Sequence, residues 1–389
     1  MRDSSTCAGD EWSDYIRRLE RADAKTKKQY LPQAYRGYAF HLYETKPNEA
    51  IRYMERAITL DAGNKQYRTD FANMLYIIAS SMVEDRQDND HQNREARKLA
   101  EKALVYNKSL AKAHVLIGDI AYDNQDLHSA KLSWTRAQSF LPNNGSLKER
   151  LAKINTERTV EKSFQRESYS FFDVRYQSGL SPSAAKNLRK YLEEVRNEVG
   201  RDFRYFPRHK LVVLAYSQKG FDQVASGRGP GWWAAFYDGK IRVPLSDSGL
   251  DDLKPTLVHE YTHAVVHDLA NGRCPRWMNE GMAEYQEAKV RMPRLHLLRI
   301  AAQKDKLIPL EDLSDALVTS NHVKGALAYE QSYSLIAYIS QKHGFSSLTR
   351  IIEHLAHRKT EDEAFQAELG VNLFQLEQDW KAWVPNLVR

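Results

Sequence analysis

The pattern His-Glu-Tyr-Thr-His begins at His259 and ends at His263, and the run Asn-Glu-Gly that contains Glu280 follows it along the chain. On a helix, residues four positions apart project from one face, so both imidazole rings can bind one metal ion. Glu260 is then available as a base for a water molecule, and Glu280 supplies a third ligand. Catalytic zinc keeps three protein ligands and one open position, whereas structural zinc is enclosed by four. The residue types and their spacing therefore predict a catalytic zinc site that performs hydrolysis.

Other kinds of metal site are tested by the positions around this pattern. A metzincin requires glycine and histidine where Val266 and Leu269 stand, so that class is excluded. His267 continues the same helical face, but it lies about 12 Å along the axis from the first histidine, so we expect a structural or supporting role. The two cysteines, Cys7 and Cys274, cannot form a cysteine-based zinc site, and whether they pair is left open. A chance pair of buried histidines is the alternative, although apolar residues surround the pattern at helical spacing.

The histidine pattern and the run Arg-Trp-Met-Asn-Glu-Gly-Met-Ala-Glu-Tyr at residues 276–285 together resemble the gluzincin metallopeptidases. The closest resemblance is to the bacterial peptidase MA-like group, whose domains are often found behind tetratricopeptide repeats. It covers about residues 165–389. The chain lacks the Gly-x-Met-Glu-Asn segment with which zinc aminopeptidases recognise an amine, so aminopeptidase activity is not implied. The resemblance implies that His259, His263 and Glu280 bind Zn²⁺ and that Glu260 is the general base.

Three further residues are expected to support this site. By the same resemblance, Glu284 matches the acidic residue that orients a ligand histidine in thermolysin-like enzymes. We expect Asn279 to support the ligands together with Glu284. Tyr329 lies in a run similar to the segment where zinc aminopeptidases carry a tyrosine that stabilises the oxyanion, although Gln-Ser replaces the usual Lys-Gly. The alternative is that Tyr329 packs in the core, in which case Tyr333, on the same helical face, is the next candidate.

Composition limits the classes to which the protein can belong. A length of 389 residues predicts two or three domains, and 42% hydrophobic residues are enough to form buried cores. The chain has no run of 18 apolar residues, so we expect no transmembrane helix and a soluble protein. That protein is either cytoplasmic or exported, to the bacterial periplasm or outside the cell, with a leader absent from this chain. A net charge of +6 without an arginine-rich cluster argues against a nucleic-acid partner.

An internal repeat predicts the organisation of residues 1–160. Small and large apolar residues recur with a period of 34 residues, and a charged insertion at residues 83–94 separates an earlier copy. This pattern indicates an N-terminal α-solenoid of tetratricopeptide type, with a generic helical bundle as the alternative. Such a module binds a peptide or protein partner, or supports the catalytic domain. The repeated residues are Ala96, Ala100 and Ala103, then Ala130, Trp134 and Ala137, and in the earlier copy Ala50, Met54 and Ala57.

The remainder predicts a mainly α protein with an α+β zincin-like catalytic domain. Residues 161–291 form an α+β lobe with the HExxH helix and the third-ligand helix, and residues 292–389 form a C-terminal helical lobe. Its expected strands lie at residues 169–176, 211–216, 232–237 and 240–245, and its expected helices at 183–199, 276–291, 326–340, 345–355 and 373–383. A sheet edge is expected just before the HExxH helix, and the resemblance to gluzincins implies that an edge strand there holds the substrate backbone. Trp232 and Trp233 line a subsite, or they pack in the core or form a turn platform.

These features lead to one functional prediction with two alternatives. We expect zinc-dependent hydrolysis of peptide bonds, with the repeats recruiting a protein substrate or partner. The first alternative is an inactive scaffold that works through its repeats, and the second is a zinc hydrolase of non-peptide amides or esters. The sequence does not identify the substrate, the position of cleavage or the oligomeric state.

Overall fold

The structure is a computed structural model that describes residues 9–84, 89–178, 182–226, 235–245 and 250–387. The described residues are mostly helical and include one small mixed sheet, which confirms the prediction of a mainly α protein. The chain forms two compact units, residues 1–155 and residues 156–389. A division of the second unit at residue 291 stays a prediction. Among the described helices, none combines the length and the apolar character that crossing a membrane requires.

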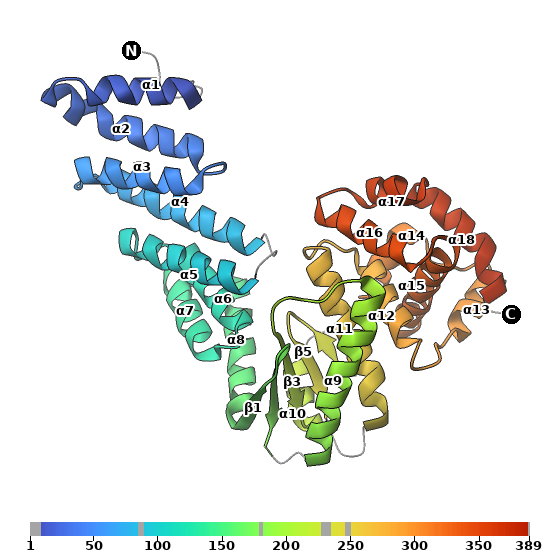
Figure 1. The fold of residues 1–389 in the computed structure, drawn as a ribbon. Helices are drawn as coiled ribbons and strands as arrows, with labels where there is room; N and C mark the ends of the chain where they lie inside the picture. Colours follow the sequence, from blue (N-terminus) through green and yellow to red (C-terminus); the bar gives the residue numbers. More distant parts are fainter. Residues whose placement is uncertain (1–8, 85–88, 179–181, 227–234, 246–249, 388–389) are drawn as a thin grey trace. The chain divides into compact units, whose positions relative to one another are not determined.

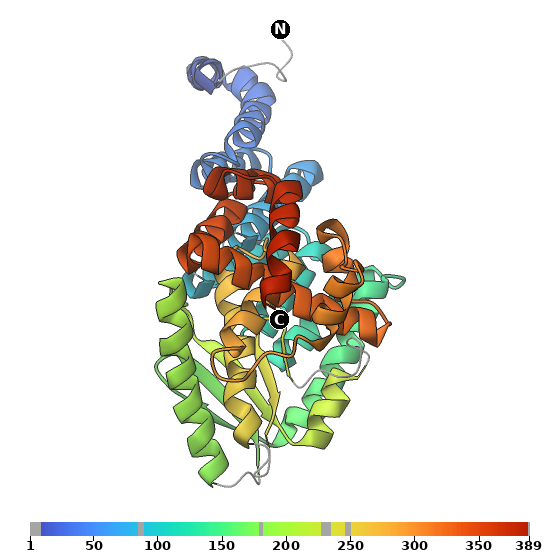
Figure 2. The ribbon, with the colours of Figure 1, turned by 90° about the vertical axis from the view of Figure 1, so that its right-hand side faces the viewer.

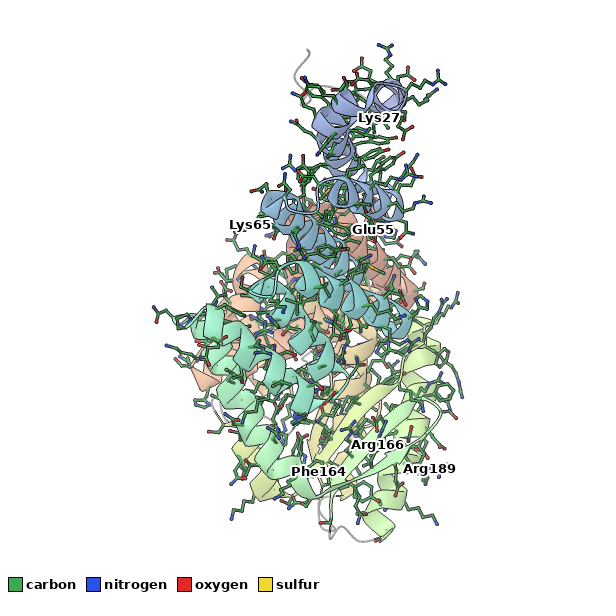
Figure 3. All side chains as sticks on the ribbon, turned by 90° about the vertical axis from the view of Figure 1, so that its left-hand side faces the viewer. Lys27, Glu55, Lys65, Phe164, Arg166 and Arg189 are labelled. Atoms are coloured by element: carbon green, nitrogen blue, oxygen red, sulfur yellow. The ribbon has the colours of Figure 1, made fainter. Side chains whose placement is uncertain are left out.

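The first unit is a series of helices in which consecutive members pack on one another, α2 on α3, α4 on α5 and α6 on α7 (Figure 1). Contacts also join successive pairs. One of them is the 2.6 Å ion pair between Lys102 of α5 and Glu55 of α3, a residue marked in Figure 3. The helices are α1 Gly9–Glu20, α2 Ala24–Leu42, α3 Pro47–Leu60, α4 Lys65–Glu84, α5 Asn89–Tyr106, α6 Ala111–Asp123, α7 Leu127–Phe140 and α8 Gly145–Val160.

Small residues let these helices approach closely. The alanines of the sequence repeat are fully buried between the helices, among them Ala50, Ala100 and Ala137. Gly118 of α6 has no room for a side chain, because a Cβ there would lie 2.4 Å from the ring of Trp134 on α7. The predicted insertion, residues 83–94, contributes the end of α4 and the start of α5, and its residues 85–88 lie outside the described part of the chain. That this series is a tetratricopeptide solenoid stays a prediction.

The second unit contains a five-stranded sheet in the order β1-β2-β3-β5-β4. Strands β2, β3 and β5 are parallel to one another, whereas β1 and β4 pair antiparallel at the two edges. Gly239 has a φ of +88° in the turn between β4 and β5, a conformation that favours glycine. Trp232 and Trp233 lie outside the described residues. The strands are β1 Phe164–Ser168, β2 Phe172–Gln177, β3 Leu211–Tyr216, β4 Phe236–Tyr237 and β5 Ile241–Pro244.

Both faces of the sheet are covered by helices. Helices α9 Pro182–Phe203 and α11 Leu250–Leu269 pack side by side on one face, as Figures 1 and 2 show. The residues that point to this face include Val174, Val213 and Val243, one from each parallel strand. Leu214 and Tyr216 point to the opposite face, which is covered by α10 Gln218–Ala225. Because side chains alternate along a strand, one apolar run serves both faces.

A buried charge cluster joins the end of α8 to the sheet. The stretch between α8 and β1 is a short 3₁₀ turn, Glu161–Ser163. Arg242 of β5 is fully buried and pairs with Glu157 at 3.2 Å and Asp238 at 3.0 Å, and it also pairs with Glu161 at 3.3 Å. It donates a further hydrogen bond of 2.5 Å to the hydroxyl of Tyr216.

After α11, helices α12, α13, α14 and α18 pack on α15, and α17 packs on α16. Helix α12 lies between α11 and α15, and it approaches α15 at Gly281, where a Cβ would lie 2.4 Å from the carbonyl oxygen of Ser332. Glycine is therefore required at this position. The helices are α12 Arg276–Glu287, α13 His296–Gln303, α14 Leu310–Ala316, α15 His322–His343, α16 Phe345–Ala356, α17 Glu361–Leu369 and α18 Leu373–Leu387.

Candidate metal centre

Helices α11 and α12 bring the three expected ligands together. His259 and His263 project from one face of α11, with ring centroids 4.8 Å apart. Glu280 projects from α12 between them, and its Oε2 atom lies 3.6 Å from His259 Nε2 and 3.5 Å from His263 Nε2. Each of the three side chains is more than four-fifths buried. The packing of α12 on both α11 and α15 thus fixes a carboxylate opposite two imidazoles.

These three residues have the donor atoms of a catalytic zinc site. One ligand atom from each lies within 4.8 Å of the others, and the set of two imidazole nitrogens and one carboxylate oxygen suits Zn²⁺. Among the described residues, a second group of this kind consists of His259, Glu284 and Glu287. It uses the Nδ1 side of the same imidazole. The Nε2 side, where two histidines and a carboxylate converge, fits a single ion better because both rings contribute.

Glu260 lies beside this group with an oxygen that has no partner. Its side chain is buried in α11, and its Oε2 atom has no hydrogen-bond partner among the described residues. Burial raises the pKa of this carboxyl, although His263 and His259 oppose the shift. Leaving a buried carboxylate oxygen unsatisfied is costly, so such a group marks a position where a water or a substrate completes the contacts. The free oxygen fits a general base.

Two polar residues on α12 hold the far sides of the histidine rings. Asn279 Oδ1 lies 3.1 Å from His263 Nδ1, the contact expected of a supporting residue. Glu287 Oε2 lies 3.0 Å from His259 Nδ1, whereas Glu284 Oε1 lies 3.9 Å from that nitrogen. Glu287 was not expected from the sequence, although its position seven residues after Glu280 puts it on the same helical face and was the available signal.

The charges of the site are strongly coupled. Burial works against the charge of His259, but hydrogen bonds to Glu280 and Glu287 raise its pKa well above the ordinary value. Burial likewise opposes ionisation of Glu280, but the two histidines hold the pKa of this carboxyl far below its usual range. Burial raises the pKa of Glu284 to about 7. The histidines and carboxylates thus stabilise one another's charged forms, and a metal that binds here competes with protons for the same ligand atoms.

A cavity of about 620 Å³ lies beside Glu287, the residue that contacts His259 Nδ1. It is lined by Glu284 and Glu287 of α12, by the segment that follows them, and by Tyr329 and Tyr333 of α15. Tyr329 is half-buried and also packs against the apolar core. Tyr329 is thus beside the supporting acids rather than among the ligand atoms, and both its predicted roles stay open.

The other residues considered for metal binding lie apart from this group. The ring of His267 packs edge-on against Tyr237 with centroids 5.9 Å apart, and it belongs to neither ligand group of the described residues. Cys274 is a free thiol, and Cys7 lies outside the described residues.

Comparison with known protein families supports a peptidase domain. The family model described as Peptidase MA superfamily matches residues 233–386, a span that includes α11, α12 and the helices that follow. The chain therefore carries a peptidase MA-like domain, which suggests a peptidase function. The match begins after β3, so the part of the expected resemblance between residues 165 and 232 is outside it. Curated proteins yield no significant match to the chain.

Proposed function

We propose that this protein is a zinc-dependent metallopeptidase of the gluzincin type that hydrolyses peptide bonds. The main support is the convergence of His259, His263 and Glu280, whose ligand atoms lie within 4.8 Å of one another. The unpartnered oxygen of Glu260 in the same helix supports a hydrolytic role, because a site that only binds metal has no need of a base. The peptidase MA-like domain makes a peptide or protein the expected substrate.

In this proposal each residue has a distinct role. When bound by His259, His263 and Glu280, zinc supplies a Lewis acid that polarises the scissile carbonyl and acidifies water. Glu260 takes the proton of the attacking water and transfers it to the leaving amine. Burial suits this task, because it moves the pKa of the Glu260 carboxyl upward from that of an exposed glutamate. Asn279 holds His263, and Glu284 lies within 4 Å of His259.

The rest of the chain serves substrate binding in this proposal. Residues 1–160 form an α-solenoid of tetratricopeptide type that recruits a protein substrate or partner. The catalytic part consists of an α+β lobe, residues 161–291, and a helical lobe, residues 292–389. Strand β4 lies at the edge of the sheet, the position from which an edge strand holds an extended peptide by strand addition. Tyr329 donates its hydroxyl to the developing oxyanion.

A zinc measurement combined with a digest of an unbiased peptide library tests the proposal. Wild-type protein is expected to carry about one zinc per chain, and His263→Ala is expected to lose it. Glu260→Gln should keep the metal and lose cleavage, because Glu260 is not a ligand. His357→Ala, a change at an exposed histidine of the same domain, is the matched control and should behave as wild type. If wild-type protein carries no zinc, the proposal is wrong. If it carries zinc but cleaves no peptide, the remaining interpretations are an inactive scaffold and a zinc hydrolase of non-peptide amides or esters.

A further inference from the structure

The hydrogen bond between His259 and Glu287 is the shortest contact that His259 makes with an acidic residue. His259 Nδ1 and Glu287 Oε2 lie 3.0 Å apart, well inside hydrogen-bond distance. The other acidic residue on that side, Glu284, lies at 3.9 Å from the same nitrogen, which is beyond it. An Nδ1–H group has one proton to donate, so the two carboxylates compete for it, and the distances favour Glu287.

The second oxygen of Glu287 is also held. Arg291, four residues further along the chain, donates from Nη1 to Glu287 Oε1 at 3.1 Å. The Glu287 side chain is 17% exposed, and the Arg291 side chain is 42% exposed. A carboxylate whose two oxygens have separate partners loses its rotational freedom. Arg291, Glu287 and His259 thus form a chain of contacts from the protein surface to the site.

This chain of contacts determines which nitrogen of His259 faces the ligand group. When Nδ1 carries the proton that Glu287 accepts, Nε2 presents its lone pair towards Glu280 and His263. His263 is oriented differently, because it contacts the neutral amide of Asn279 at 3.1 Å. A carboxylate partner makes an imidazole more basic than an amide partner does, so His259 is expected to be the stronger of the two ligands.

We propose that Glu287, held by Arg291, is the positioning residue for His259 and the main acidic determinant of zinc affinity outside the ligands. The inference rests on the proposed zinc site. It assigns to Glu287 the role that the sequence resemblance implies for Glu284, three residues earlier on α12.

Zinc affinity, measured by competition with a chelator in the full-length protein, tests the assignment. Glu287→Ala is expected to weaken zinc binding about 10 to 100-fold. Arg291→Ala removes the second anchor and should cause a smaller loss, and Glu287→Gln should lie between wild type and Glu287→Ala because its amide oxygen still accepts the proton. Glu353→Ala, at an exposed glutamate of α16, is the matched control and should keep the wild-type affinity. A Glu287→Ala protein that binds zinc as tightly as wild type, or a larger loss from Glu284→Ala, would overturn the assignment.

A second readout separates failure of this inference from failure of the zinc site itself. In histidine-labelled protein, the Nδ1–H proton of His259 should give a low-field, slowly exchanging NMR signal, with or without zinc, because Glu287 accepts it in both states. The signal should persist in Glu284→Ala and disappear in Glu287→Ala. If wild-type protein shows the signal but binds no zinc, the proposed function fails while the role of Glu287 stands. If the signal survives in Glu287→Ala, Glu287 does not hold His259.

Discussion

Tyr329 and Tyr333 of α15 each have two interpretations, as a donor to the oxyanion or as a packing residue. They lie one helical turn apart and line the same cavity as Glu284. If the Tyr329 hydroxyl donates to the oxyanion, Tyr329→Phe removes a donor needed mainly in the transition state. We expect kcat to fall about 100 to 1000-fold, or about 2.7 to 4 kcal/mol, while KM and zinc content barely change. Steady-state kinetics on a peptide identified by the library digest measures this.

The matched change, Tyr333→Phe, controls for the loss of a hydroxyl from the same cavity. Tyr333 packs against Tyr285 with ring centroids 6.2 Å apart, so its ring has a clear packing role. Should Tyr329→Phe lower thermal stability and spare kcat, Tyr329 is a core residue. A fall of kcat in Tyr333→Phe alone would transfer the oxyanion role to that residue.

At the residue scale, the sequence predicts which residues share a face of one helix. It does not predict the distances between side chains on different helices. The positions of His259 and His263 follow from helical geometry alone, so the sequence predicted that they share a face. The choice between Glu284 and Glu287 depends on how α12 is rotated against α11. Both positions lie on the same face of α12, and only the packed structure shows that one is 0.9 Å nearer to His259, at 3.0 Å against 3.9 Å.

At the scale of the elements, the contact of α12 with α15 positions the third ligand. Gly281→Ala would place a methyl group 2.4 Å from the carbonyl oxygen of Ser332, and backbone cannot move aside cheaply. Overpacking of this kind costs about 1 to 3 kcal/mol, more than the helix propensity that alanine adds. Because Glu280 is the preceding residue, zinc affinity should fall as well. Thermal unfolding and zinc competition measure the two effects.

Gly145→Ala provides the comparison for this prediction. Gly145 begins α8, and a Cβ there would meet no atom within 4 Å. The unfolding temperature and the zinc affinity of the Gly145→Ala protein should match those of wild type. A Gly281→Ala protein as stable as the Gly145→Ala protein would show that α12 can shift without cost, and the contact would not position Glu280.

The buried charge cluster at β5 predicts a dependence of stability on pH. The pKa of Lys240 is lowered to about 7, mainly by burial and secondly by the nearby charge of Arg242. In the unfolded chain the pKa of lysine is about 10.4, so between pH 7 and 10 the unfolded state binds more protons and stability rises with pH. The rise is at most about 1.4 kcal/mol per pH unit. Lys240→Met should flatten this slope in urea unfolding measured from pH 7 to 10.

Lys219→Met, at an exposed lysine of α10, serves as the control and should keep the wild-type slope. The difference between the two variants isolates Lys240 from other groups that titrate in this range. Equal slopes in wild type and Lys240→Met would mean that Lys240 stays protonated in the folded protein.

The elements themselves were predictable to different degrees. Leu211–Tyr216 is a strand because a continuous apolar run fits a strand buried on both faces, and the sequence predicted its bounds. Strand β1, Phe164–Ser168, was not predicted, because polar residues occupy most of this edge strand and only pairing with β2 stabilises it. Glu157, near the end of α8, is buried against Arg242, a contact between residues 85 positions apart that no local pattern reveals.

At the scale of the whole molecule, that same contact bears on where the second unit can be separated from the first. The sequence placed the boundary at residue 160, whereas the compact second unit begins at residue 156 and includes Glu157. A fragment that starts at residue 161 therefore lacks one of the carboxylates that pair with the buried Arg242. Removing the only partner of a buried charge costs about 3 to 5 kcal/mol. Arg242 keeps Asp238 and Glu161 in that fragment, so the expected loss of stability is smaller.

We therefore predict different behaviour for two fragments. A fragment of residues 145–389 keeps the whole of α8 and should be soluble, carry about one zinc and cleave a small unstructured peptide as the full chain does. A fragment of residues 161–389 should be less stable than the longer fragment in urea unfolding, by less than the cost of about 3 to 5 kcal/mol for a wholly unpaired buried charge. Glu157→Gln in the longer fragment separates loss of the ion pair from loss of the helix, and it should lower stability in the same direction. If neither fragment folds, residues 1–144 support the catalytic domain rather than recruit its substrate. If the longer fragment cleaves small peptides but no longer cleaves a protein substrate of the full chain, those residues recruit it.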